Sequence, residues 1–115
     1  MKLFIYELYL RDVVGLKDIK ETSIKRVDKK ECYIIIISTN KGKIKLLQSY
    51  DRIVGIYDYN KNIILVECQK IENNKAYKSF SKTTSKHINL FIDTISNESN
   101  STPILENTPN FDILF

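Results

Sequence analysis

The sequence predicts an α+β fold: an antiparallel β meander of about five strands, one C-terminal amphipathic helix packed on it, and an extended tail. Three observations support this. Short β-branched runs alternate with turn residues in the middle of the chain, a helix-period apolar stripe follows, and a polar segment without Lys or Arg comes last. The length of 115 residues favours one domain. We therefore expect a single α+β domain over residues 1–96 and a polar acidic tail with an apolar tip over residues 97–115.

The first two segments differ in how clearly they predict structure. Residues 2–10, KLFIYELYL, are mostly apolar on both faces, which favours an interior strand. Residues 12–28 are ambiguous. Asp12 could cap a short helix, although Gly15 weakens this interpretation, or the stretch could be a loop followed by a strand. Both alternatives stay open for this segment.

The central segment predicts four consecutive strands joined by short turns. Residues 31–39, ECYIIIIST, are a β-branched run bounded by polar residues, and the turn sequence NKG follows it. The runs KIKLLQS, RIVGIYD and NIILVEC predict three more strands. Gly55 inside the second of these indicates a bulge or a close approach to the backbone. The polar stretch that comes next could hold one more short strand around Tyr77.

The segment KTTSKHINLFI, residues 82–92, predicts the start of the helix. Thr83 or Thr84 can accept hydrogen bonds from the free N–H groups of the first turn. An apolar stripe that faces the sheet then follows at i, i+3, i+4 and i+7: Ile88, Phe91, Ile92 and Ile95. Leu90 lies off the stripe. His87, the only histidine, is interpreted as a half-buried residue that bonds a backbone carbonyl or a neighbouring strand.

Few residue patterns in the chain support enzyme chemistry. GxSxG is absent, and three glycines are too few for a phosphate-binding loop. Cys32 and Cys68 lie in no CxxC pair and have no His or Cys at metal-ligand spacing, so we interpret them as buried, reduced thiols. We expect a non-enzymatic protein with no catalytic residue, metal or cofactor. The absence of a signal peptide and of an apolar run of transmembrane length predicts a cytoplasmic protein without a membrane partner.

Charge is distributed unevenly along the chain. Residues 1–92 hold all 18 Lys and Arg and ten of the 14 Asp and Glu, a net charge of +8, whereas residues 93–115 carry −4. A basic body with interleaved tyrosines could stack bases and hold phosphates, and the same side chains can anchor a protein interface. The residues selected for partner binding are Tyr50, Arg52, Tyr57, Tyr59, Lys61, Tyr77, Lys78, Lys82, Lys86, Phe111, Asp112 and Phe115.

The last five residues, FDILF, allow two interpretations. They resemble the acidic, Phe-ended tail tips with which bacterial and phage single-stranded-DNA-binding proteins recruit partners. The alternative, which we favour, is an edge strand or a hydrophobic clasp that closes the domain.

Two pieces of the chain, SYDRIVGIYD at residues 49–58 and YKSFSKTTSKHINLFI at residues 77–92, carry a resemblance. Together they resemble a family of short, uncharacterised proteins encoded by phages and plasmids, and the resemblance spans residues 47–92. The positions that match in the second piece are Thr83, Thr84, His87, Ile88, Asn89 and Phe91. The resemblance implies a small α+β unit of mobile-element origin in a bacterial host. It implies no established activity.

Two functions are expected from these observations. The first is a phage or mobile-element accessory protein that acts by protein–protein binding, for example as an inhibitor of a host defence nucleoprotein in the manner of anti-CRISPR proteins. The alternative is a nucleic-acid-binding protein that uses a basic, Tyr- and Lys-rich sheet face, with the acidic tail either shielding that face or recruiting partners. The identity of the partner and the oligomeric state stay open.

Overall fold

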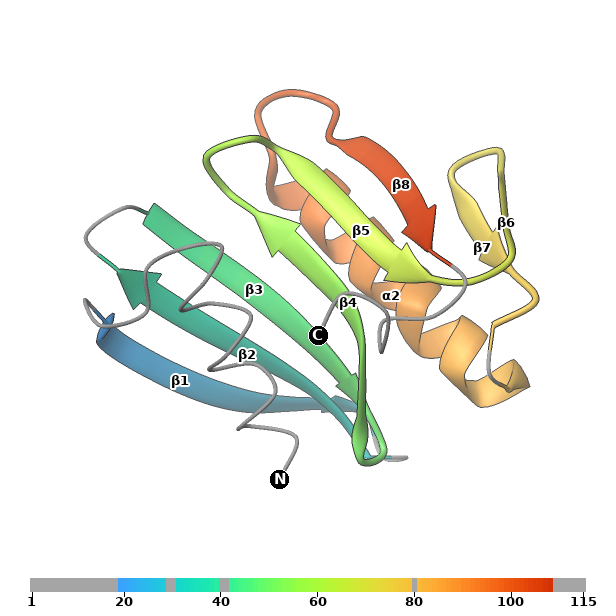
Figure 1. The fold of residues 1–115 in the computed structure, drawn as a ribbon, viewed down its shortest axis with the longest axis horizontal. Helices are drawn as coiled ribbons and strands as arrows, with labels where there is room; N and C mark the ends of the chain where they lie inside the picture. Colours follow the sequence, from blue (N-terminus) through green and yellow to red (C-terminus); the bar gives the residue numbers. More distant parts are fainter. Residues whose placement is uncertain (1–18, 29–30, 40–41, 80, 109–115) are drawn as a thin grey trace.

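A computed structural model describes residues 19–28, 31–39, 42–79 and 81–108 of the protein. In this part of the chain, a six-stranded sheet carries one helix on one face, with a two-stranded hairpin beside the helix (Figure 1). The α+β fold predicted from the sequence is confirmed. The elements are β1 (Ile19–Asp28), β2 (Cys32–Thr39), β3 (Gly42–Ser49), β4 (Arg52–Asp58), β5 (Ile63–Glu67), β6 (Lys70–Glu72), β7 (Lys75–Tyr77), α2 (Lys82–Glu98) and β8 (Ile104–Thr108).

The large sheet has the order β1-β2-β3-β4-β5-β8. The first five strands are an antiparallel meander, and four of them, β2 to β5, are those that the β-branched runs and short turns predicted. Within the ambiguous segment 12–28, the described residues form the strand β1, and residues 12–18 lie outside the described part. The strand predicted over residues 2–10 also lies outside it.

The last strand, β8, is part of the segment that we expected as a tail. It pairs with β5 in parallel, from Ile63 opposite Ile104 to Glu67 opposite Thr108. A parallel neighbour requires a crossover, and here α2 is part of the connection that returns the chain to the sheet. The predicted tail tip, residues 111–115, lies outside the described residues.

The helix begins at a different cap from the one predicted. Ser81 has extended backbone angles, and its Oγ accepts a hydrogen bond from the N–H of Thr84 at 3.0 Å. The choice of Thr83 or Thr84 as cap was therefore wrong, because both threonines already lie in the first turn. The apolar stripe was correct, since its four members are buried against the sheet. The helix ends at Glu98, two residues past the expected domain boundary.

Gly55 brings the helix close to the sheet. A Cβ atom at this position would lie 3.0 Å from Phe91 Cε2 and 3.2 Å from Leu47 Cβ. The pairing of β3 with β4 also shifts register between Leu47 and Gln48. Both structural features that a glycine inside a strand can indicate, a bulge and a close approach to the backbone, are therefore present at Gly55.

The sheet is apolar on both faces. One cluster of buried side chains joins the helix stripe to the strand residues that face it, including Leu47, Val54 and Val66. A second cluster consists of strand residues that alternate with the first: Ile35, Ile37, Ile44, Leu46, Ile53 and Ile56. Continuous apolar runs such as residues 34–37 arise because a strand buried on both faces needs no polar alternation.

We expect Gly55→Ala to lower the free energy of unfolding by about 1 to 3 kcal/mol, because the added methyl group overpacks the Phe91 ring. Chemical denaturation measures the change. The double variant Gly55→Ala/Phe91→Leu provides the matched comparison, since the smaller side chain leaves room for the methyl group. The double variant should lose less stability than the sum of the two single variants. Additive losses would contradict this contact.

Candidate binding groove

A groove of about 360 Å³ opens between α2 and the strands at the β1 side of the sheet. It exists because the helix packs on β3, β4 and β7, so that β1 and β2 extend past it (Figure 1). The floor is formed by the aliphatic side chains of Val27, Ile34 and Leu47 together with the Phe91 ring. The result is an open, largely apolar depression of the size that binding sites commonly have.

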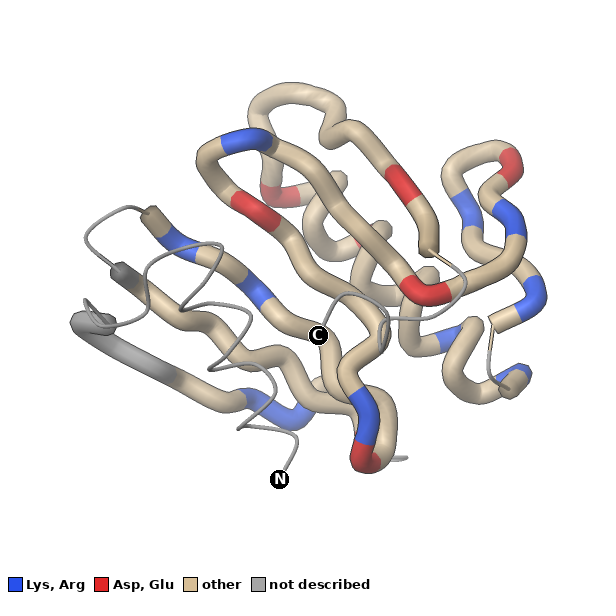
Figure 2. The backbone as a smooth tube through the Cα atoms, in the orientation of Figure 1, with Lys and Arg blue, Asp and Glu red and all other residues tan. Residues whose placement is uncertain are grey.

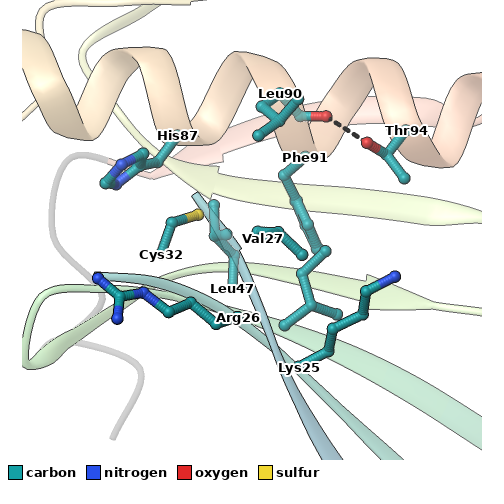
Figure 3. Close-up of a pocket in the computed structure, with 10 residues that line it drawn as sticks. Lys25, Arg26, Val27, Cys32, Leu47, His87, Leu90, Phe91 and Thr94 are labelled. Carbon is teal, nitrogen blue, oxygen red and sulfur yellow. Dashed lines mark hydrogen bonds between the residues drawn. The ribbon is translucent and has the colours of Figure 1, made fainter. Parts of the chain in front are cut away.

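The β1 wall of the groove carries two cations. Lys25, Arg26 and Val27 all line it, although alternate residues of a regular strand point to opposite faces. The pairing of β1 with β2 shifts register between Arg26 and Asp28, and an irregularity of this kind re-aims a side chain. Lys25 and Arg26 therefore both lie across the groove from the helix (Figure 3).

The helix wall presents Leu90 and Thr94. The Leu90 side chain is 39% exposed, and Thr94 Oγ1 donates a hydrogen bond to the Leu90 carbonyl at 2.8 Å (Figure 3). Lys86 lies one turn before Leu90, so that it projects from the same side of the helix. No carboxylate is among the residues that line the groove in the described part of the chain.

His87 closes one end of the groove and fastens the helix to the sheet. It is fully buried, and its Nδ1 lies 2.7 Å from Ser49 Oγ, which also lies 3.2 Å from Thr84 Oγ1. The interpretation of His87 as a packing residue bonded to a strand is confirmed, with full rather than partial burial. The Ser49 hydroxyl is itself buried, so this arrangement holds two elements together and offers no accessible nucleophile.

Two of the predicted binding residues have structural contacts. Arg52 donates through Nε and Nη2 to the two carboxylate oxygens of Glu67, each at 2.8 Å, and the Glu67 side chain is buried. The Tyr57 ring packs in the core, and its hydroxyl donates to Asn62 Oδ1 at 2.6 Å. Both side chains therefore have hydrogen-bond partners within the fold.

Tyr59 belongs to a small cluster near the end of the helix. Its ring centroid lies 4.7 Å from that of Tyr57, and the Nζ atoms of Lys43 and Lys45 lie 5.2 and 5.8 Å from it. Lys45 also donates to Glu98 at 3.0 Å. Burial lowers the pKa of Lys45, but hydrogen bonds to Glu98 and Tyr59 outweigh it and raise the pKa above 10.5.

Four other predicted residues lie together. Tyr77 is 42% exposed on β7, Lys78 follows it, and Lys82 and Lys86 are exposed on the first turns of α2. Figure 2 shows cations grouped at the hairpin and the start of the helix. Asn89 joins the two elements by accepting from the N–H of Ala76 at 2.8 Å and donating to its carbonyl at 3.2 Å.

The remaining predicted residues are scattered. Tyr50, 40% exposed, lies in the β3–β4 turn, and Lys61 is exposed in the β4–β5 turn. Phe111, Asp112 and Phe115 lie outside the described residues.

Lys25, Arg26, Leu90 and Thr94 were not selected from the sequence. The only signals were a weak alternation around Lys25 and the position of Leu90 off the helix stripe.

The cysteines fit the expected reduced state. Cys32 and Cys68 are both buried and form no disulfide, and burial raises the pKa of the Cys68 thiol despite opposing hydrogen bonds with the backbone of Lys70 and Tyr77. Among the described residues, no group of three or more His, Cys, Asp and Glu side chains could hold a metal ion. The one described helix is too short and too polar to cross a membrane.

The model of DUF8033, a family of unknown function, matches residues 16–107. The chain belongs to this family. The match includes β1 to α2 and all but the last residue of β8, so every element that forms the groove lies within the DUF8033 region. No curated protein and no solved structure matches the chain.

We expect His87→Ala to lower the free energy of unfolding by about 2 to 4 kcal/mol, because it leaves a cavity under α2 and removes a partner of the buried Ser49 hydroxyl. Urea denaturation followed by circular dichroism measures the change. Lys86→Ala, one residue away and exposed, is the matched control and should stay within about 0.5 kcal/mol of the wild type. Equal stability of the two variants would contradict the fastening role of His87.

Proposed function

We propose that this DUF8033 protein is a small accessory protein of a phage or mobile element that acts by binding another protein in the cytoplasm of a bacterial host. Its partner would be a host defence nucleoprotein, which binding inhibits. The observation that carries the proposal is the groove, with its aliphatic floor beside a cationic β1 wall. The mobile-element origin is supported by the resemblance of residues 47–92.

An apolar floor surrounded by polar groups is the arrangement found at the centre of protein interfaces. Leu90 is a large aliphatic side chain that stays 39% exposed on the helix wall, where a partner could cover it. The cations at Lys25 and Lys86 would favour a partner surface with negative charge. These features support a binding role for the same part of the molecule that the helix leaves uncovered.

Affinity capture tests the proposal. The tagged wild-type protein should enrich a specific host protein from bacterial lysate. Leu90→Glu should fail to enrich that protein, because a partner covering the groove would have to bury the new carboxylate on the helix wall. Lys70→Glu, on strand β6 of the hairpin, adds a carboxylate outside the groove and should retain it.

The partner identified in this way is then purified and assayed with and without the protein. Loss of its nucleic-acid-directed activity is the expected result, and it should disappear with Leu90→Glu. Retention of the partner by Leu90→Glu, or the absence of any enriched protein, would overturn the proposal.

A second candidate function is nucleic-acid binding. The observation that favours it is the group of Tyr77, Lys78, Lys82 and Lys86 at the start of the helix, which combines an exposed ring with several cations. Such a surface can hold phosphates while the ring stacks on a base.

Fluorescence anisotropy with labelled single-stranded DNA, duplex DNA and RNA measures this activity. If the cluster binds nucleic acid, affinity should fall steeply as salt rises from 50 to 200 mM, the range over which such contacts weaken. The triple variant Lys78→Glu/Lys82→Glu/Lys86→Glu should abolish binding, whereas Lys43→Glu, on β3 and outside this cluster, should have little effect. Absence of binding at low salt would remove this candidate.

A further inference from the structure

We infer that the groove accepts an extended acidic–apolar peptide segment of the partner, in which one or two large apolar residues are flanked by Asp or Glu. The inference rests on the proposed function and adds the chemistry of the segment that is bound. It follows from the charge, the floor and the size of the groove, each of which selects against a different kind of ligand.

The charge of the groove selects for carboxylates. Lys25 and Arg26 line the β1 wall, and Lys86 lies beside the groove, one helical turn before Leu90. Within the described part of the chain, neither Lys25 nor Lys86 lies within ion-pair distance of an acidic group. An acidic segment would therefore gain electrostatic attraction without displacing a carboxylate that belongs to either lysine.

The floor selects for aliphatic or aromatic side chains. The half-buried Val27 and the 39% exposed Leu90 offer hydrocarbon surface, and Leu47 and Phe91 lie buried beneath them. A sugar–phosphate backbone would leave this surface uncovered. The Phe91 ring is 1% exposed and is packed against Gly55, so it cannot act as a platform for stacked bases. The floor therefore favours a peptide over a nucleic acid at this site.

The size of the groove selects for a short segment. A volume of about 360 Å³ is at the lower end of the range for small-molecule sites, which is room for a few side chains. An extended peptide places alternate side chains on opposite sides, so that apolar residues can face the floor while acidic neighbours face the walls.

Three fluorescein-labelled peptides test the inference by anisotropy with the full-length protein: DELFDE, its cationic counterpart KKLFKK, and its polar counterpart DESSDE. DELFDE should bind at least roughly tenfold more tightly than either counterpart, since each loses one of the two complementary features. Lys25→Glu and Leu90→Ser should each weaken DELFDE binding several-fold. Lys70→Glu, which makes the same charge change at an exposed site on β6 outside the groove, should leave it unchanged.

Thermal melts establish that each variant is folded, which is expected because Lys25, Lys70 and Leu90 are all exposed. Equal binding of DELFDE and DESSDE would indicate charge attraction alone and overturn the inference, as would equal binding of KKLFKK or no binding of DELFDE. If Leu90→Glu loses the captured host protein but the wild-type protein binds no peptide, the proposed function stands. Only the inference that the groove binds an acidic–apolar segment would then fail. Retention of the host protein by Leu90→Glu would remove both.

Discussion

The contact between the Phe91 ring and the backbone at Gly55 sets the position of the helix, and the rest of the structure depends on it. The ring occupies the space that a side chain at position 55 would need, since a Cβ there would lie 3.0 Å from Phe91 Cε2. The helix is thereby held over β3 and β4. Because one helix cannot cover six strands, no other described residues cover the β1 side of the sheet on this face, and the groove forms along that boundary.

Polar contacts fix the helix on either side of Phe91. Towards its start, His87 bonds to Ser49 on β3, and at its end Glu98 accepts from Lys45 on the same strand. The raised pKa of Lys45 means that its stabilising contribution is complete below pH 10.5 and is lost only as the pH rises through the higher folded value. The Glu98 side chain is 57% exposed, so this ion pair is a modest anchor compared with the buried contacts of His87.

The predictable parts of the fold were those that local sequence determines. The β-branched run at residues 34–37 identifies a buried strand, and the apolar stripe through Phe91 identifies an amphipathic helix. Both can be read from the sequence because side chains change direction at a different spacing in a strand and in a helix. Strand β8 could not be predicted in the same way. Its residues, ILENT, become a strand only because β5 offers a parallel edge after the crossover. Ser81 was missed as the helix cap because Ser81, Thr83 and Thr84 all lie within four positions. Each carries a hydroxyl group that can cap a helix, so the sequence does not distinguish them.

The binding residues were less predictable, because whether a charged side chain is paired within the fold depends on residues that are distant in the sequence. Arg52 and Lys25 are both strand cations beside apolar residues, and nothing local distinguishes them. In the folded chain, Glu67 lies 2.8 Å from Arg52 and holds its guanidinium through two hydrogen bonds, whereas Lys25 has no such neighbour in the described part. A tyrosine in a strand is equally undetermined, since Tyr57 faces the core and Tyr77 is exposed.

The groove combines two kinds of interaction that act at different stages of binding. Cations such as Lys25 and Lys86 act over a distance of about a Debye length, so they raise the rate at which an acidic segment arrives. The hydrocarbon floor acts only on contact, where removal of apolar surface from water lengthens the lifetime of the complex. Higher salt should therefore slow association more than it hastens dissociation, a distinction that follows from placing the charges on the walls and the aliphatic side chains beneath them.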